Sequence, residues 1–286
     1  HRDLHSFPTR RSSDLYGSTA GLPELRERTV DRLRQLDGVG FGTSAADAFT
    51  ADRLLLTNGS QQLLYLVTEA LCDPGDIVLV EDPTYFVFLG IAQSHGLRCR
   101  GVQLQPDGLD VDHLERTLAD LHRRGELSRV KFLYLVTYYQ NPTGTTTTFA
   151  RKARALAVLR RYERLAGHPL YLLEDAAYRE LRFAGTAVPS ALTAGDPSRV
   201  IYAGTYSKPF ATGVRLGFGL LPPGLFRATA RIKGNHDFGS ASLLQHLLAR
   251  ALATGAYDRH LAVLTRRYAR KAATIDRKST RLNSSH

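Results

Sequence analysis

The chain alternates between short apolar runs and longer stretches in which apolar side chains recur every three or four residues. A short apolar run is typical of a buried strand, and the longer spacing indicates a helix with one buried face. The runs predict strands over residues 53–57, 77–80, 97–102, 131–136, 170–174 and 199–203. The helical spacing predicts helices that follow Pro23 and Ser60, helices over residues 84–95, 111–123 and 149–166, and a helical region from Leu221 to about Ile275.

Strands that alternate with helices in this way predict an α/β fold. The sheet is expected to be mainly parallel and sandwiched by helices on both faces. The sequence shows no internal repeat and no low-complexity linker. We therefore expect one large domain over residues 16–276.

The two ends of the chain do not share this pattern. Residues 1–15 and 277–286 carry no apolar periodicity, and methionine is absent from all 286 residues. The first segment also lacks the apolar stretch of a secretory signal. Both segments resemble translated vector or adapter sequence, so we expect them to be non-native and the chain to be a fragment of a longer protein.

Composition narrows the class of protein. The chain is 43% hydrophobic and 23% charged, which is typical of a globular protein, and no apolar run reaches the ~18 residues of a membrane span. The net charge is +11, but the arginines are scattered over the expected helices, which does not favour nucleic-acid binding. Cys72 and Cys99 indicate two free thiols in a reducing cytoplasm, and the histidines show no metal-ligand spacing.

Polar residues stand where the expected strands end, and open α/β sheets bind their ligands at that edge. Ser60 and Gln61 open a helix, where backbone N–H groups favour a phosphate; a plain N-cap by Ser60 is the alternative. Asp175 follows the strand at 170–174 and could instead cap the next helix. Lys208 and Arg215 follow the strand at 199–203, and a lysine at such a place is less usual than one on a solvated face.

Together these residue types match one chemistry. A lysine amine in a pocket forms a Schiff base with a carbonyl cofactor, and a carboxylate beside a pyridine nitrogen keeps that nitrogen protonated. The protonated ring then accepts electrons from a carbanion. An arginine, hydroxyl groups and a helix N-terminus supply the donors that a phosphate needs.

Several short motifs occur in a fixed order along the chain. They are Tyr16-x4-Gly21-Leu22-Pro23, Thr57-Asn58-Gly59-Ser60-Gln61-Gln62, Asp82-Pro83-Thr84-Tyr85, Gln140-Asn141-Pro142-Thr143-Gly144, Glu174-Asp175-x-x-Tyr178 and Ser207-Lys208-x6-Arg215. In this combination the sequence resembles the fold-type I pyridoxal-phosphate enzymes, and within them the class I/II aminotransferases, over residues 16–275. The nearest members are the aminoadipate and kynurenine aminotransferases and the aminotransferase-like half of MocR-type regulators.

The resemblance implies pyridoxal 5′-phosphate as the cofactor and gives each matched residue a role. Lys208 resembles the Schiff-base lysine and proton shuttle, and Asp175 would pair with the pyridine nitrogen. Asn141 and Tyr178 would hydrogen-bond the ring hydroxyl oxygen, with Tyr178 counted among the catalytic residues. Tyr85 would stack on the ring face.

The resemblance also implies a phosphate site and a partner subunit. The phosphate would be held by Ser60, Gln61, Thr205, Ser207 and Arg215. Tyr16 matches a tyrosine that reaches the phosphate of a neighbouring subunit, which implies a homodimer. In the family a smaller C-terminal domain supplies the arginine that binds the substrate carboxylate, and we expect that domain to be largely missing from this chain.

The function implied is the transfer of an amino group from an amino acid to a 2-oxo acid. The alternative is the effector domain of a MocR-type transcription regulator, which would bind nucleic acid only through a further N-terminal domain. Asn141 favours the enzyme, because the regulators often replace this asparagine. Lyases and decarboxylases on the same fold share all these motifs, so the sequence leaves the type of reaction open.

Overall fold

The centre of the molecule is a mainly parallel sheet. The computed structural model describes residues 18–40 and 46–283, and over these residues the sheet has the strand order β1-β8-β7-β6-β5-β2-β3-β4. The strands are β1 (Leu54–Thr57), β2 (Ile77–Asp82), β3 (Arg98–Gln105), β4 (Gly108–Leu109), β5 (Val130–Val136), β6 (Tyr171–Asp175), β7 (Val200–Thr205) and β8 (Gly217–Leu220). From β7 to β3 all neighbours are parallel, whereas β8 is antiparallel to β1 and β7, and β4 is antiparallel to β3.

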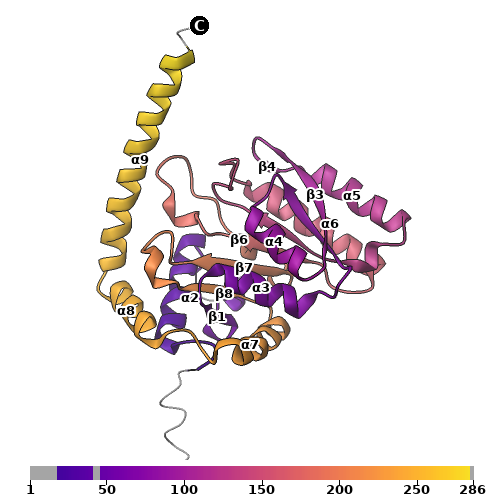
Figure 1. Ribbon diagram of the computed structural model, residues 1–286, viewed down its shortest axis with the longest axis horizontal. Helices are drawn as coiled ribbons and strands as arrows, with labels where there is room; N and C mark the ends of the chain where they lie inside the picture. Colours follow the sequence, from indigo (N-terminus) through magenta and orange to yellow (C-terminus); the bar gives the residue numbers. More distant parts are fainter. Residues whose placement is uncertain (1–17, 41–45, 284–286) are drawn as a thin grey trace, which may run out of the picture.

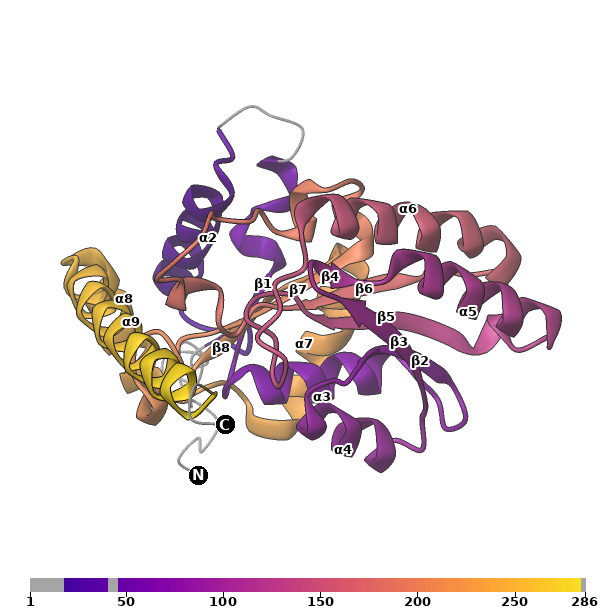
Figure 2. The same ribbon diagram turned by 90° about the horizontal axis from the view of Figure 1, so that it is seen from above.

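Helices cover both faces of this sheet. The α-helices are α2 (Pro23–Asp37), α3 (Ser60–Leu71), α4 (Phe86–Ser94), α5 (Val111–Arg123), α6 (Phe149–Ala166), α7 (Pro223–Asp237), α8 (Ser242–Ala253) and α9 (Ala256–Asn283). Short 3₁₀ helices occupy Ala46–Ala48, Ala51–Arg53, Leu127–Arg129, Arg179–Leu181, Ala191–Thr193, Pro197–Arg199 and Thr212–Val214. Figure 2 shows α2, α5 and α6 on one face and α3, α4 and α7 on the other. The predicted α/β sandwich is therefore confirmed.

The central strands are apolar on both faces because each face packs against helices. In β5, Leu133 and Leu135 belong to the core beneath α2, α5 and α6. Phe132 and Tyr134, which point the opposite way, belong to the core beneath α3 and α4. Alternate side chains of one strand thus belong to two different cores. By the same alternation, polar residues at the end of a strand can point to either face of the sheet.

The sequence pattern did not predict β4 or β8, and it placed the last helix end too early. The segment Gly217–Leu220 contains two glycines, which weaken a strand signal. These glycines are required by α3: a Cβ at Gly219 would lie 2.6 Å from the Leu63 side chain.

The expected helical region after Leu221 divides into α7, α8 and α9, and α9 continues past Ile275 to Asn283, projecting from the body of the molecule (Figure 1). No helix in the described ranges is both long and apolar enough to cross a bilayer.

A buried ion pair fixes the end of β6, directly before Asp175. The Lys152 ammonium group donates to Glu174 Oε1 at 2.7 Å and to the Pro189 carbonyl at 3.0 Å, and both charged side chains are fully buried. Glu174 also accepts the Thr137 hydroxyl at 2.9 Å and the Ala191 N–H at 2.7 Å. This carboxylate therefore joins β5, β6 and the 189–191 segment.

Replacement of Lys152 by methionine is expected to destabilise the protein by about 3–5 kcal/mol, because Glu174 would remain as a buried charge without its cation. Urea unfolding measures the loss. The double variant Lys152→Met/Glu174→Gln should recover part of it, since the buried charge is then removed. Equal stability of the single variant and the wild type would contradict this account of the pair.

Candidate active site

The register of the sheet gathers residues from distant parts of the chain at one edge. Across β8, Thr57 at the end of β1 and Thr205 at the end of β7 both pair with Gly217. In the centre of the sheet, Asp175 at the end of β6 pairs with Val136 of β5. The segments that follow β1, β5, β6 and β7 therefore leave the sheet at its carboxyl edge, where open α/β sheets bind ligands.

Asp175 lies at the centre of this edge and is 4% exposed. Its Oδ2 accepts the Tyr134 hydroxyl at 2.9 Å, and its Oδ1 accepts the Ala177 N–H at 3.1 Å. Burial raises the pKa of Asp175 to about 6, an effect that these hydrogen bonds and the charge of Lys208 reduce. A carboxyl in this state can exchange a proton with a basic nitrogen near neutral pH.

Lys208 and Tyr178 lie next to each other near this carboxyl. Lys208 follows β7 in a turn and is exposed, and its ammonium nitrogen lies 5.7 Å from the centroid of the Tyr178 ring. Burial raises the pKa of Tyr178, and a side-chain hydrogen bond with Asn141 partly offsets that rise. Burial also raises the pKa of Tyr85, which interacts with the charges of Tyr178, Asp175 and Arg215. The residues predicted to surround the cofactor ring are thus brought together.

The predicted phosphate ligands lie at the start of α3 and between the end of β7 and the start of β8. Gly59, with φ of 79°, is the N-cap of α3, and no side chain caps the helix, so the alternative of an N-cap by Ser60 is wrong. Ser60 is instead the first helical residue. A side chain at Gly59 would lie 3.2 Å from the Arg215 guanidinium, so that guanidinium lies against the helix N-terminus. Free N–H groups and a cation together favour an anion.

A buried hydroxyl at this place also fits a phosphate. Thr205 Oγ1 donates to the Leu216 carbonyl at 3.2 Å and accepts the Ser207 N–H at 3.1 Å. Ser207 Oγ is buried and has no hydrogen-bond partner among the described residues. Because buried polar groups are nearly always hydrogen-bonded, this hydroxyl suits a ligand oxygen. Two other predicted phosphate ligands, Gln61 and Arg215, line an open hollow of about 380 Å³.

The close approach of β8 to α3 makes Gly217 critical for the phosphate site. A Cβ at Gly217 would lie 2.4 Å from the Gly59 carbonyl carbon and from the Ser60 nitrogen. Gly217→Ala is therefore expected to destabilise the protein by about 1–3 kcal/mol through overpacking. It should also weaken pyridoxal phosphate binding by roughly tenfold, the equivalent of about 1.4 kcal/mol, because the first turn of α3 moves.

Gly213→Ala is the matched control, since nothing lies within 4 Å of a Cβ at Gly213. Titration of each variant with pyridoxal phosphate, followed by fluorescence, gives the two affinities. An affinity of the Gly217 variant equal to that of the Gly213 variant would show that the start of α3 tolerates displacement.

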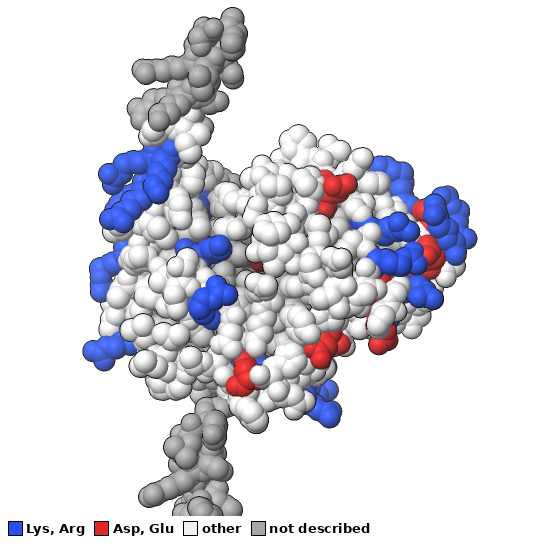
Figure 3. Space-filling model, in the orientation of Figure 1, with Lys and Arg blue, Asp and Glu red and all other residues white. Residues whose placement is uncertain are grey.

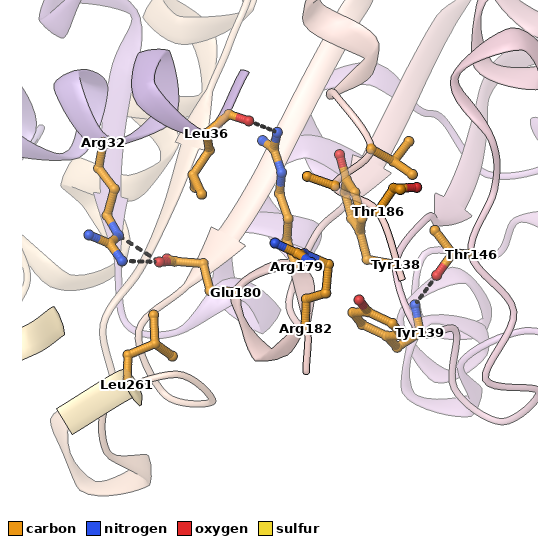
Figure 4. A pocket seen from close by; sticks show the side chains of 12 residues that line it. Arg32, Leu36, Tyr138, Tyr139, Thr146, Arg179, Glu180, Arg182, Thr186 and Leu261 are labelled. Carbon is orange, nitrogen blue, oxygen red and sulfur yellow. Dashed lines mark hydrogen bonds and ion pairs between the residues drawn. The ribbon is translucent and has the colours of Figure 1, made fainter. Parts of the chain in front are cut away.

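A second, more enclosed cavity of about 160 Å³ lies beside the Tyr178–Arg182 segment. Its lining is drawn in Figure 4: Arg32, Leu36, Tyr138, Tyr139, Thr146, Arg179, Glu180, Arg182, Thr186, Ala187, Val188 and Leu261. Arg32 pairs with Glu180, and Arg179 pairs with the buried Asp37. The residues predicted to bind the cofactor are not in this lining, so we place the candidate active site at the carboxyl edge instead.

One residue of the site was not predicted from the sequence, and one predicted residue cannot be placed. Tyr134, which donates to Asp175, was not predicted. Val136 pairs with Asp175 across β5 and β6, and Tyr134 lies two residues before Val136, on the same face of β5. The pairing of β5 with β6 would therefore have identified Tyr134 as a neighbour of Asp175. Tyr16 lies outside the described residues. The roles of the other predicted residues stay predictions, although their positions are now known.

A family model for aminotransferases of class I and II matches residues 6–281. The chain belongs to the class I and II aminotransferase family. An aromatic-amino-acid aminotransferase of Thermococcus litoralis is 31% identical over 86% of the chain and 55% of its own length. A regulatory protein of rhizopine catabolism from Rhizobium meliloti, described as probable, is 28% identical over 90% of the chain and 48% of its own length.

A solved structure from the aminotransferase family has the same fold. It is an alpha-aminoadipate aminotransferase of Thermus thermophilus, complexed with N-(5′-phosphopyridoxyl)-L-leucine, with a TM-score of 0.77 and 29% identity over 93% of this chain and 62% of that one. The chain spans less than two thirds of the length of these relatives.

Proposed function

We propose that the whole protein is a pyridoxal-phosphate-dependent aminotransferase, which moves an amino group from an amino acid to a 2-oxo acid. The observation that carries the proposal is the meeting of Lys208, Tyr178 and the buried Asp175 at one edge of the sheet. Membership of the aminotransferase family supports it. The Thermus relative, whose ligand contains a phosphopyridoxyl group linked to leucine, supports the choice of cofactor.

The residues at the ring end of the site have complementary tasks. When bound, pyridoxal phosphate supplies an electron sink that stabilises negative charge at the substrate α-carbon. Lys208 would supply the amine that holds the cofactor, and it is placed to move a proton at the substrate α-carbon. Asp175 keeps a proton on the ring nitrogen, since its negative charge favours the cationic ring. Asn141 and Tyr178 would donate hydrogen bonds to the ring hydroxyl oxygen, and Tyr85 would cover one face of the ring.

The residues at the other end anchor the phosphate. Ser60 and Gln61 offer the N–H groups of the first turn of α3, and Arg215 adds a positive charge. Ser207 adds a hydroxyl group, whose Oγ is buried and without a protein partner among the described residues. The Thr205 hydroxyl, which donates to the Leu216 carbonyl, holds the Ser207 N–H beside it. A dianion held by charged and uncharged donors in this way is bound tightly.

The test is a single-turnover experiment on the whole protein loaded with pyridoxal phosphate. A panel of amino acids is added without an acceptor, and formation of the 2-oxo acid is followed together with the absorbance of the cofactor. Formation of a 2-oxo acid supports an aminotransferase, whereas release of carbon dioxide or ammonia indicates a lyase or a decarboxylase. A whole protein that takes up no pyridoxal phosphate would overturn the proposal.

The second candidate is the effector domain of a MocR-type regulator, which the similarity to the rhizopine regulatory protein favours. Asn141 favours the enzyme instead, because the regulators often replace this asparagine. On the face shown in Figure 3, basic side chains form separate groups on α9 and at the opposite end of the molecule, where acidic side chains lie among them. Binding of pyridoxal phosphate and an amino acid by the whole protein without any turnover would support the regulator.

The proposal extends to assembly, compartment and chain organisation. Tyr16 would reach the phosphate of a second copy, so we propose a homodimer, and the exposed Phe86 and Leu243 offer apolar contact area. Cys72 and Cys99 are free, which fits the reducing cytoplasm. We retain residues 16–276 as the native domain, with residues 1–15 and 277–286 as foreign segments.

A further inference from the structure

The side chain of Gln140 is almost completely buried between two turns of the active site. It is 2% exposed and lies directly before Asn141. Its Nε2 donates to the Pro83 carbonyl at 2.7 Å and to Glu81 Oε2 at 3.3 Å. Its Oε1 accepts the N–H of Thr143 at 2.9 Å and the hydroxyl of Thr143 at 2.7 Å. Each polar atom of the amide is thus used twice.

These partners fix which way the amide points. The Pro83 carbonyl can only accept a hydrogen bond, and the Thr143 N–H can only donate one. The nitrogen of the amide must therefore face Pro83 and the oxygen must face Thr143. The main chain of Gln140 is held as well, because its N–H donates to the Thr145 carbonyl at 2.8 Å and its carbonyl accepts the Gly144 N–H at 2.6 Å.

The two turns joined by this amide carry different parts of the candidate cofactor site. Pro83 follows β2 and stands two residues before Tyr85, whereas Gln140 belongs to the turn after β5 that carries Asn141. The strands β2 and β5 are neighbours in the sheet, but their last paired residues are Val80 and Tyr134. Beyond that point the Gln140 amide bridges the two segments.

Glu81, at the end of β2, links the Gln140 side chain to the main chain of β5. It is 1% exposed, and its Oε2 also accepts the Val136 N–H at 2.9 Å. Burial raises the pKa of Glu81 to about 8, so the carboxyl is mainly protonated at neutral pH. It therefore holds Gln140 without placing a second full negative charge beside Asp175.

We propose that Gln140 is a positioning residue, whose amide sets the distance between Tyr85 and Asn141 across the cofactor ring. The inference rests on the proposed function, because it concerns two side chains that would contact pyridoxal phosphate. Leucine has nearly the same size as glutamine but cannot form any of the four hydrogen bonds. Gln140→Leu therefore releases both turns while the space remains filled.

The matched control is Gln245→Leu, because Gln245 is a similar buried bridge and neither it nor its two main-chain partners is a residue predicted to bind the cofactor. It is 4% exposed, its Oε1 accepts the Leu22 N–H at 2.6 Å, and its Nε2 donates to the Ser240 carbonyl at 2.6 Å. Both variants remove a buried amide that joins two segments of main chain. A loss that reflects stability alone should appear in both.

Two measurements on the full chain test the proposal. Hydrogen exchange of the unloaded protein should become faster in residues 84–88 as well as in residues 141–146 of the Gln140 variant, although only the second segment is adjacent to the change. Fluorescence titration should show pyridoxal phosphate affinity weakened at least about tenfold, consistent with the loss of one to two net hydrogen bonds. The Gln245 variant should keep its affinity within about twofold of the wild type, because Gln245 bonds to no residue predicted to bind the cofactor.

Unchanged exchange in residues 84–88, or an affinity of the Gln140 variant equal to that of the Gln245 variant, would overturn the positioning role. In both cases the wild type still binds the cofactor, so the proposed function would stand. If the wild-type chain takes up no pyridoxal phosphate, the proposed function fails, and the role of Gln140 toward the cofactor fails with it.

Discussion

Lys208→Ala is expected to abolish covalent attachment of pyridoxal phosphate and nearly all conversion of amino acids. The lysine acts from within the site, and positioning of a reacting group supplies about 7–11 kcal/mol of the barrier. At about 1.4 kcal/mol for each tenfold change, the rate should fall by roughly five to eight powers of ten. The measurement is single-turnover formation of the 2-oxo acid by the loaded protein.

A second readout identifies the attached residue directly. After reduction with borohydride, the wild type should carry the added mass of the cofactor on the peptide that contains Lys208, and the variant should carry none. Lys271→Ala is the control, because Lys271 is an exposed lysine on α9 and should leave both readouts unchanged. Attachment that persists in the Lys208 variant would mean that another amine holds the cofactor.

Asp175→Asn is expected to have the second largest effect. Without the charge, nothing at this position favours a protonated ring nitrogen, and the electron sink weakens. A contribution of roughly 4–7 kcal/mol to the barrier corresponds to about three to five powers of ten in turnover. Turnover near that of the wild type would show that Asp175 only caps the turn through its bond with the Ala177 N–H.

The same variant should make the unloaded protein more stable at neutral pH. Burial raises the pKa of Asp175 from 3.8 to about 6, so the folded chain holds this proton more tightly than the unfolded chain does. Stability therefore falls as the pH rises from about 4 to about 6, when the unfolded chain ionises first. A shift of this size corresponds to at most about 3 kcal/mol, and the variant should avoid that loss at pH 7.5 but show no gain below pH 4 in urea unfolding.

The sequence was most informative where local signals act alone. The bounds of α5 and α6 agree with the predicted ranges, because Asp110 caps α5 through the His113 N–H at 2.9 Å and Gly167 ends α6 with φ of 79°. β8 was missed because its glycines are selected by contacts with α3, which is far away in the sequence. Propensity describes a residue and its neighbours, and it contains no information about such contacts.

The candidate site likewise divides into residues that local motifs predicted and contacts that depend on distant segments. Motifs placed Lys208, Asp175 and Tyr178 at strand ends, and the parallel order of the sheet was enough to bring those ends together. The bond from Tyr134 to Asp175 depends on the register between β5 and β6. The bonds of Gln140 to Pro83 depend on how two turns lie after their strands have separated. Neither is encoded in the spacing of a motif.

The sheet also determines the order in which parts of the molecule can mature during synthesis. Among the described strands, β1 is made first, yet its partner β8 is made last, after every other strand of the sheet. The apolar Leu54–Leu56 edge must therefore wait for most of the domain to be translated, and such late, distant pairing makes folding slow. A nascent chain that ends before Gly217 cannot hold the start of α3 against Arg215. The anion-binding start of α3 is therefore among the last parts of the domain to take its final form.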